Sequence, residues 1–544
     1  MKRYAGITKS RVLRTASAVA ALAALTFAGG ASAGVSQSGE AKSMNRVGHV
    51  DLQGRPAYQP NVIAYPDGRT IAFAGTHGGT APNPLKAGSP VENNGTMIID
   101  VTDPSNPKEL YHIPVAVAGG QAQMARMCLG SDLPGGTPGT VYLMRNLQTN
   151  NLNFSGYEVW DVTNPSAPSA APISEIRHIR STHKLWWECN TGVAYLPGSK
   201  DASFGLPLWR TSQSMVIVDW ANPAAPPVYL RTDGPPGAQP AAVSQTAHSP
   251  NSLHGAISAH EHPNAAGGLT GYLPTPGDNI IGNRVYAAWG VGDDGILQIL
   301  DRKKLLPSLS NGRGGTYAGP ADLPTDADLD VAQAGRLDMS PDQGGHTSLP
   351  VFGLEPPSYQ SYTQFKRRDI VVLSSEATAD RCDEPPHWAF IVDVTVENSK
   401  TRPPATRAAL EPNPYQGPMV LSTLSVDPRD GEKYPRGNYC TRGARFGVHS
   451  SEENFRNPFY GKLTVIAWFT GGVRVWDIRE PQAPVLVAFY VPEGVPPPDD
   501  PDGGYMTNNV EVDNRGYIYA TDRNGFGLDI LQLMPPASHI ISGK

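Results

Sequence analysis

Six short hydrophobic runs in this chain each end in aspartate, and most of them continue into a proline-rich turn. The first run, Met97-Ile98-Ile99-Asp100, leads into Asp103-Pro104-Ser105-Asn106-Pro107. The six runs end at Asp100, Asp161, Asp219, Asp301, Asp393 and Asp477, and four of them precede a turn with two spaced prolines. Such self-similarity indicates an array of like supersecondary units. An aspartate at the same place in every unit predicts a structural role, in which its side chain accepts hydrogen bonds from turn amides.

The segments between these aspartates have the pattern of short β-strands. Thr140–Met144, Arg284–Trp289 and Asp369–Leu373 are rich in Val, Ile and aromatic residues and are bounded by turn-forming residues. With 57 Gly and 52 Pro in 544 residues, the chain has too many turn formers for a helical protein. The shortest spacing, 58 residues from Asp161 to Asp219, is enough for a four-stranded unit. The repeat therefore predicts an all-β propeller, with loop insertions in its longer units.

The two ends of the chain are expected to share a unit. Asn509–Asp513, Tyr517–Ala520 and Leu528–Leu531 read as three strands, and no fourth strand follows them. Arg46–Leu52 precedes the first full unit and supplies the missing strand, which removes the open sheet edges. This composite unit and the six repeats predict a seven-bladed β-propeller closed by an N-terminal strand. An open solenoid, the alternative, needs capping units, and the sequence has none.

The repeated runs and their Asp and Pro turns resemble the LVIVD-repeat propeller family of exported bacterial proteins. The resemblance covers nearly all of the chain after its first 33 residues. It implies the fold and little about chemistry, because one fold hosts many functions.

Residues 1–33 read as a secretory signal peptide. Five basic residues precede the apolar stretch Ala18–Ala28, and Ala31-Ser32-Ala33 has the small residues of a cleavage site. We expect an exported protein, periplasmic or extracellular, with a flexible N-terminal segment at 34–45, a single propeller domain at 46–535 and a C-terminal tail at 536–544. Without the signal, 39 basic residues face 50 acidic ones, a net charge of −11. An acidic chain without basic clusters argues against nucleic acid as a partner, and no run is long enough for membrane insertion.

Four cysteines, Cys128, Cys189, Cys382 and Cys440, have no C-x-x-C spacing, so a zinc or redox motif is not indicated. In an exported chain they predict two disulfides. The blade map places Cys128 and Cys189 on inner strands of adjacent blades, and Cys382 and Cys440 in neighbouring loops. We therefore expect the pairs Cys128–Cys189 and Cys382–Cys440.

The start of each inner strand faces the propeller axis, and four consecutive blades place a histidine there. These residues are His183, His254, His346 and His449, out of only 13 histidines in the chain. Imidazole is the commonest metal ligand, and a ring of inner strands brings ligands together. Four nitrogen donors without a thiolate favour copper or iron, with zinc as a third choice, over calcium or magnesium. The alternative is a wet channel in which these histidines only bond water and one another.

Further polar residues are expected around the same hub. The equivalent positions in blades one and seven are Gln59 and Asn509, and loops on the same face carry His77, Arg145 and Arg210, all predicted to bind substrate. Glu188, Glu376 and Glu452 are predicted to orient the histidines or assist catalysis, and Arg523 to act beside them. Trp186 and Trp187 alternate along one strand and are expected to pack into the core on its two faces.

The sequence thus favours a metal-dependent oxidoreductase acting on a small organic substrate. By fold, it is similar to carotenoid oxygenases and to the copper-containing propellers of the selenium-binding, methanethiol-oxidising type, although their flanking motifs are not matched here. Two alternatives stay open. One is a non-catalytic propeller that binds a protein or glycan partner at the cell surface or in the periplasm, and the other is a metal-dependent hydrolase using the same pocket.

Overall fold

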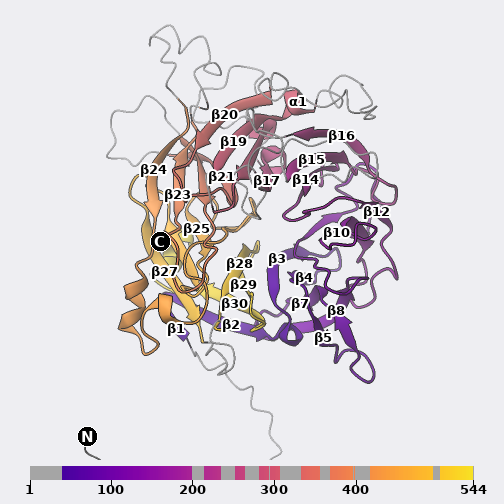
Figure 1. Ribbon diagram of the computed structural model, residues 1–544, viewed down its shortest axis with the longest axis horizontal. Coiled ribbons are helices and arrows are strands. Elements are labelled where there is room, and N and C mark those ends of the chain that lie inside the picture. Colours follow the sequence, from indigo (N-terminus) through magenta and orange to yellow (C-terminus); the bar gives the residue numbers. More distant parts are fainter. Residues whose placement is uncertain are drawn as a thin grey trace, which may run out of the picture. The chain divides into compact units, whose positions relative to one another are not determined.

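The protein is described here from a computed structural model, shown in Figure 1. The structure describes residues 39–198, 213–233, 252–263, 281–292, 295–306, 332–355, 368–395, 397, 417–493 and 503–542. Residues 37–544 form one compact unit. Within the described residues, no helix is long and apolar enough to cross a membrane.

Seven antiparallel sheets surround a central axis as the blades of a propeller (Figure 1). Blade one comprises β3 (Ala57–Ala64), β4 (Thr70–Thr76), β7 (Gly95–Asp100) and β8 (Lys108–Pro114), and blade two comprises β9 (Ala125–Leu129), β10 (Val141–Leu147), β11 (Gly156–Asp161) and β12 (Ser174–Arg177). Blade three comprises β13 (Trp186–Trp187), β14 (Val193–Gly198), β15 (Ser214–Asp219) and β16 (Val228–Asp233), and blade four comprises β17 (Leu253–Ser258), β18 (Arg284–Trp289), β19 (Ile296–Asp301) and β20 (Gln333–Asp338). Blade five comprises β21 (Thr347–Leu354), β22 (Arg368–Ser374), β23 (Ala389–Asp393) and β24 (Met419–Leu424).

The last two blades contain both ends of the described chain. Blade six comprises β25 (Leu463–Ala467), β26 (Val473–Asp477), β27 (Val485–Pro492) and β1 (Gly39–Lys42). Its innermost strand is reduced to the bridge between Ser451 and Ile466. Blade seven comprises β28 (Thr507–Val512), β29 (Tyr517–Asp522), β30 (Leu528–Leu533) and β2 (Met44–Val50). The predicted seven-bladed all-β fold, closed by an N-terminal strand, is therefore confirmed.

Short elements decorate the loops between these strands. A small hairpin of β5 (Thr80–Pro82) and β6 (Val91–Asn93) lies within blade one. The helical turns are η1 (Leu52–Gly54), η3 (Ala259–Glu261), η4 (Ile281–Asn283), α1 (Arg302–Leu305), η6 (Pro428–Lys433), η7 (Tyr439–Thr441) and α5 (Ala537–Ser542). The helix α5 lies in the segment that the sequence designated a C-terminal tail.

The six aspartate-ended runs are the third strands of blades one to six, and their aspartates have one structural role. Asp100 Oδ1 accepts from the Thr102 amide at 2.9 Å, and Asp161 Oδ1 accepts from the Thr163 amide at the same distance. The other four aspartates bond a turn amide two or three residues ahead in the same way. The prediction that these carboxylates accept hydrogen bonds from turn amides is confirmed, so the repeated aspartate has a structural role.

Two N-terminal strands, not one, join the last blades. The predicted pairing of 46–52 with the final unit is present as β2 with β30, from Met44 opposite Leu533 to Val50 opposite Leu528. The segment 34–45, expected to be flexible, differs from that expectation, because β1 within it pairs with β27. A buried ion pair explains this docking: Glu40 is 6 % exposed and lies 3.0 Å from Arg442. The polar sequence of β1 gave no sign of a strand, because neither its backbone pairing with β27 nor the Glu40–Arg442 ion pair requires apolar residues.

The core lies between neighbouring blades, where facing sheets bury their side chains. Trp186 and Trp187 are both buried and belong to different clusters, Trp186 with Leu253 and Trp289, and Trp187 with Tyr157. Alternation along β13 thus sends one indole to each side of the blade, as predicted.

Two disulfides connect the pairs of cysteines that the sequence analysis expected. Cys128 on β9 bonds Cys189 just after β13, which joins blades two and three. Cys382, in the loop after β22, bonds Cys440 in η7. Both pairs are consistent with an exported protein.

Removing the inter-blade disulfide is expected to destabilise the protein. The bond closes a segment with a sequence separation of 61, so its loss restores chain entropy to the unfolded state. The double substitution Cys128→Ala with Cys189→Ala should lower the free energy of unfolding by about 2–4 kcal/mol. Denaturant unfolding measures this, with the corresponding Cys382/Cys440 variant in parallel. An unchanged unfolding midpoint would contradict a stabilising role.

Candidate metal centre

The four predicted histidines meet at the hub, around the hydroxyl of Tyr58. Tyr58 Oη lies 3.1 Å from Nε2 of His183 and 3.3 Å from Nε2 of both His254 and His346. His449 completes the group, with its ring centroid 4.2 Å from that of His346. Tyr58, His254, His346 and His449 are at most 3 % exposed. The hub is thus a cluster of imidazoles from blades three to six and one phenol from blade one.

The outer nitrogen of each ring has a hydrogen-bond acceptor beside it. His254 Nδ1 lies 2.8 Å from the His346 carbonyl oxygen, and His449 Nδ1 lies 2.5 Å from the Asn508 carbonyl oxygen. A carbonyl only accepts, so both rings carry their proton on Nδ1. Their Nε2 atoms therefore present lone pairs to the hub. This is the arrangement that second-shell acceptors impose on metal-binding histidines.

The other two rings have the same tautomer through side-chain partners. His183 Nδ1 lies 2.9 Å from Gln123 Oε1, while Gln123 Nε2 donates to His77 Nδ1 at 2.9 Å. His346 Nδ1 lies 2.9 Å from Thr347 Oγ1, which also accepts from Lys184 Nζ. The Thr347 hydroxyl keeps its own proton for Ser450 Oγ, 3.0 Å away, because Ser450 donates to the Ser451 carbonyl.

Burial keeps these imidazoles neutral. It lowers the pKa of His183 to about 3, and the neighbouring charges of Lys184 and Arg523 act in the same direction. Burial likewise holds the pKa of His254, His346 and His449 well below the ordinary value. Four neutral rings with Nε2 lone pairs directed inward leave the hub rich in electron pairs.

Glu376 adds a carboxylate to the same space. Its Oε2 lies 3.7 Å from His346 Nε2 and its Oε1 lies 3.6 Å from His449 Nε2, both beyond hydrogen-bond length. The ligand atoms of His254, His346 and Glu376 all lie within 4.8 Å of one another. Among the described residues, His449 Nε2 has no hydrogen-bond partner. Donor atoms that converge without protons between them are what a bound cation requires.

Tyr58 was missed by the sequence analysis, which placed Gln59 at the hub. The register of β3 against β4 shifts between Ala57 and Pro60, and this bulge turns Tyr58 toward the axis. A similar shift in β17 lies at His254. Bulges are recognised from strand pairing and not from composition, so the only available signal was the phenol next to the predicted position.

The remaining predicted residues are divided between the hub and other places. Glu376 lies at the hub and Arg523 beside it, donating to Asn508 Oδ1 at 3.4 Å. His77 lies near the hub, with its ring 5.4 Å from that of Tyr58. Gln59 and Asn509 are buried and bond each other at 2.6 Å, which joins blades one and seven.

Three candidates have structural contacts away from the histidines. Arg145 donates to Glu158 and to the carbonyls of Ile113 and Pro114. The carboxylate of Glu188 binds Arg302, Tyr195, Ser258 and Thr191. Glu452 accepts from Asn454 and Asn457, and burial raises its pKa to about 8. None of these contacts is with a hub histidine. Arg210 lies outside the described residues.

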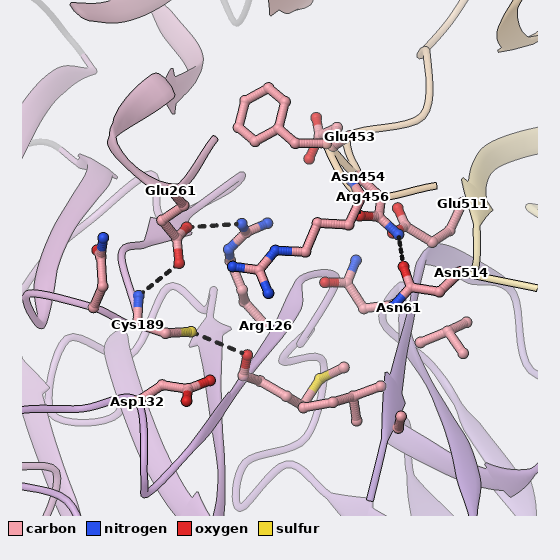
Figure 2. A pocket seen from close by; sticks show the side chains of 16 residues that line it. Asn61, Arg126, Asp132, Cys189, Glu261, Glu453, Asn454, Arg456, Glu511 and Asn514 are labelled. Atoms are coloured by element: carbon pink, nitrogen blue, oxygen red, sulfur yellow. Dashed lines mark hydrogen bonds and ion pairs between the residues drawn. The ribbon is translucent and has the colours of Figure 1, made fainter. Parts of the chain in front are cut away.

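A pocket of ≈ 420 Å³ lies at the other end of the inner strands (Figure 2). Six blades line it, one after another, with Asn61, Arg126, Cys189, Glu261, Glu453 and Glu511. Figure 2 shows Arg126 and Arg456 extending toward each other across it, with Arg126 bonded to Glu261. The hub histidines do not line this pocket.

A buried lysine separates this pocket from the hub. Lys184 pairs with Glu453, which lines the pocket, and donates to Thr347 and Ser450 beside the hub histidines. Gly255, the neighbour of His254, makes room for it, since a Cβ there would lie 2.9 Å from Lys184 Cδ. Lys184 thus lies between the pocket residue Glu453 and the residues Thr347 and Ser450 beside the hub.

Comparison with known proteins identifies the repeat. The LVIVD repeat model matches residues 91–112, which span β6 to β8 of blade one. This match confirms the resemblance suggested by the repeated runs. No curated protein matches the chain.

Several solved structures are similar to the chain at low identity. The Dos1 propeller is 9 % identical, with a TM-score of 0.41, and the match covers 90 % of this chain and 96 % of that one. The Cps50 (Swd1) β-propeller domain of Myceliophteria thermophila is 10 % identical, with a TM-score of 0.39, covering 88 % and 97 %. Chaetomium thermophilum Sqt1, bound to the N-terminus of the ribosomal protein L10, is 12 % identical, with a TM-score of 0.38, covering 90 % and 99 %. These likenesses transfer no activity to this chain.

Proposed function

Starting from a seven-bladed β-propeller that carries an LVIVD repeat, we propose that the protein is a metal-dependent oxidoreductase that acts on a small organic substrate at its hub. His183, His254, His346 and His449 hold the metal through Nε2. Glu376 and the Tyr58 hydroxyl supply oxygen donors on the same side. Nitrogen-rich sites with added oxygen donors suit copper and iron, and zinc less specifically.

One observation supports this proposal above the others. Three inward Nε2 lone pairs lie within 3.3 Å of a single hydroxyl, which has one proton to donate. Two of those lone pairs therefore face oxygen lone pairs, and the Glu376 carboxylate adds further negative charge. Unsatisfied buried polar atoms are costly, so an unloaded hub is strained electrostatically and a cation relieves it. A merely hydrogen-bonded channel of histidines does not need four identical tautomers.

Each hub residue has a defined part in this proposal. The acceptors on Nδ1 orient the rings and raise their basicity toward a metal. Glu376 stands between His346, His449 and the Arg445 guanidinium, so it is placed to bind the metal or take a proton beside it. A copper or iron ion would supply one-electron chemistry there. Glu188 and Glu452 leave the proposed catalytic set, because their partners lie elsewhere.

Metal analysis of the purified protein tests the proposal. We expect close to one copper or iron per chain, and His254→Ala should lower occupancy by more than about tenfold, since it removes a ligand and not only a supporting contact. His260→Ala is the matched control, because His260 bonds the Gly282 carbonyl outside the hub. A wild-type protein that binds no copper, iron or zinc on reconstitution, with unchanged stability in His254→Ala, would favour the non-catalytic binding propeller.

A further inference from the structure

Partly exposed residues border the hub on one side, here called the opening, and two of these residues are arginines. His254, His346 and His449 are buried, whereas His77, His183, Arg445 and Arg523 are partly exposed. A substrate that reaches the hub histidines from this face therefore passes both guanidinium groups.

In space, one residue lies between each arginine and a hub histidine. Arg445 Nη1 donates to Glu376 Oε1 at 3.2 Å and to the Ala377 carbonyl at 3.4 Å. Arg523 Nη1 donates to Asn508 Oδ1 at 3.4 Å, and the backbone oxygen of Asn508 holds His449 Nδ1. Arg523 makes no other side-chain hydrogen bond among the described residues, so most of its N–H donors are unused.

The two arginines at this opening share few carboxylate partners. Among the described residues, Arg445 is hydrogen-bonded to Glu376, and Arg523 is hydrogen-bonded to no carboxylate, although the charges of Glu376 and Asp380 act on it from a distance. Asp522, next in the chain, directs its carboxylate to the amides of Met506, Asn524 and Phe526. Burial lowers the pKa of Arg523, and the neighbouring Arg445 lowers it further, as happens to a cation without a full counter-ion.

We propose that Arg523 and Arg445 bind the anionic group of the substrate, and that the substrate is a small organic acid whose carboxylate occupies this opening. The planar guanidinium fork matches a carboxylate bidentately, and its charge strengthens the hydrogen bonds. The proposal rests on the proposed function only in placing the reacting part of the acid against the hub. A phosphate ester would also present an anion to these arginines, and the experiment below distinguishes it from a carboxylate.

Calorimetric titration of the purified protein with benzoate tests this subsite. We expect one benzoate per chain, and Arg523→Gln should weaken its binding by about tenfold or more, as loss of charged hydrogen bonds predicts. Arg523→Lys keeps the positive charge but loses the planar guanidinium fork, so its benzoate affinity should lie between those of the wild type and Arg523→Gln. Arg479→Gln is the matched control, because Arg479 is 55 % exposed and, within the described part of the chain, forms an ion pair only with Asp477. Benzamide, the neutral analogue, should bind no differently to the wild type and Arg523→Gln.

Two further measurements make the result decisive. Inorganic phosphate is titrated in parallel. Tighter binding of phosphate than of benzoate would contradict an organic acid as the substrate and indicate a phosphate ester. Equal benzoate affinity in the wild type and Arg523→Gln would overturn the subsite. Metal content is measured on the same samples. If the protein takes up no metal but still binds benzoate in a way that depends on Arg523, the anion subsite is supported and the proposed oxidoreductase function is contradicted.

Discussion

Removing residues 34–50 is expected to abolish the cooperative folding of this protein. The deletion takes away β1 and β2, which are the outer strands of blades six and seven. It exposes the hydrogen-bonding edges of β27 and β30, and it uncovers the side chains that Met44, Val47 and Val50 cover. At about 1.5–3 kcal/mol for a fully buried apolar side chain, buried Met44 and partly buried Val47 and Val50 together contribute at most about 4.5–9 kcal/mol before any hydrogen bond is counted. That is comparable to the whole stability of many domains.

The shorter deletion of residues 34–42 distinguishes the contribution of β1 to stability from that of β2. It removes β1 alone, together with the Glu40–Arg442 ion pair, and leaves β2 in blade seven. We expect this variant to unfold in one transition at a lower denaturant concentration, while the longer deletion aggregates through its open edges. Circular dichroism during denaturant titration and light scattering distinguish these outcomes. An unfolding midpoint of the 34–50 deletion equal to that of the wild type would show that the ring does not depend on its N-terminal strands.

Arg302→Met should cost about 3–5 kcal/mol of unfolding free energy, because it leaves a buried carboxylate without its counter-ion. Arg302 donates to Glu188 at 2.9 and 2.6 Å, and Glu188 is fully buried between blades three and four. Burial alone would raise the pKa of Glu188, but the charge and hydrogen bonds of Arg302, with those of Ser258 and Thr191, hold it below its ordinary value.

The pH dependence of this variant follows from the sign of that shift. In the wild type, the lowered pKa of Glu188 contributes stability that is present above about pH 4.5 and is lost as the pH falls below it. In Arg302→Met the isolated carboxylate takes a proton more readily, so the difference between the two proteins should shrink as the pH falls. Urea unfolding from pH 8 to pH 4 measures this. Arg429→Met, at an exposed pair with Asp427, is the control and should leave the stability nearly unchanged at every pH.

The sequence predicted the fold well because its signals are local and repeated. Each aspartate-ended run combines strand periodicity with a turn whose amides the aspartate caps, so Asp100 and its five equivalents carry the same information in every blade. The missing fourth strand of the last blade then required a partner from elsewhere, and Arg46–Leu52 had the right pattern. The blade map also placed the cysteines correctly, since adjacent inner strands bring Cys128 and Cys189 together.

The hub was predicted only in part, because several of its residues are placed by non-local geometry. The histidines stand at equivalent positions and were found from the repeat. Tyr58 reaches the axis through a bulge, and Arg445 lies in an irregular loop that no periodicity describes. Glu188 and Glu452 were chosen for closeness in sequence to a histidine, but an extended strand carries each residue about 3.3 Å further from the hub. Glu376, from a loop of another strand, reaches the hub instead.

The pairing of the two chain ends also governs when the protein finishes folding. Arg46 and Asp529, bonded at 3.2 Å, are 483 residues apart in sequence. During synthesis β1 and β2 emerge early, and they have no partner until β27 of blade six and β30 of blade seven have left the ribosome. Their backbone hydrogen bonds and apolar side chains stay without partners during translation, so the ring of blades can close only after synthesis is complete. A chain built in this way stays open for transport or chaperone capture until its last residues arrive.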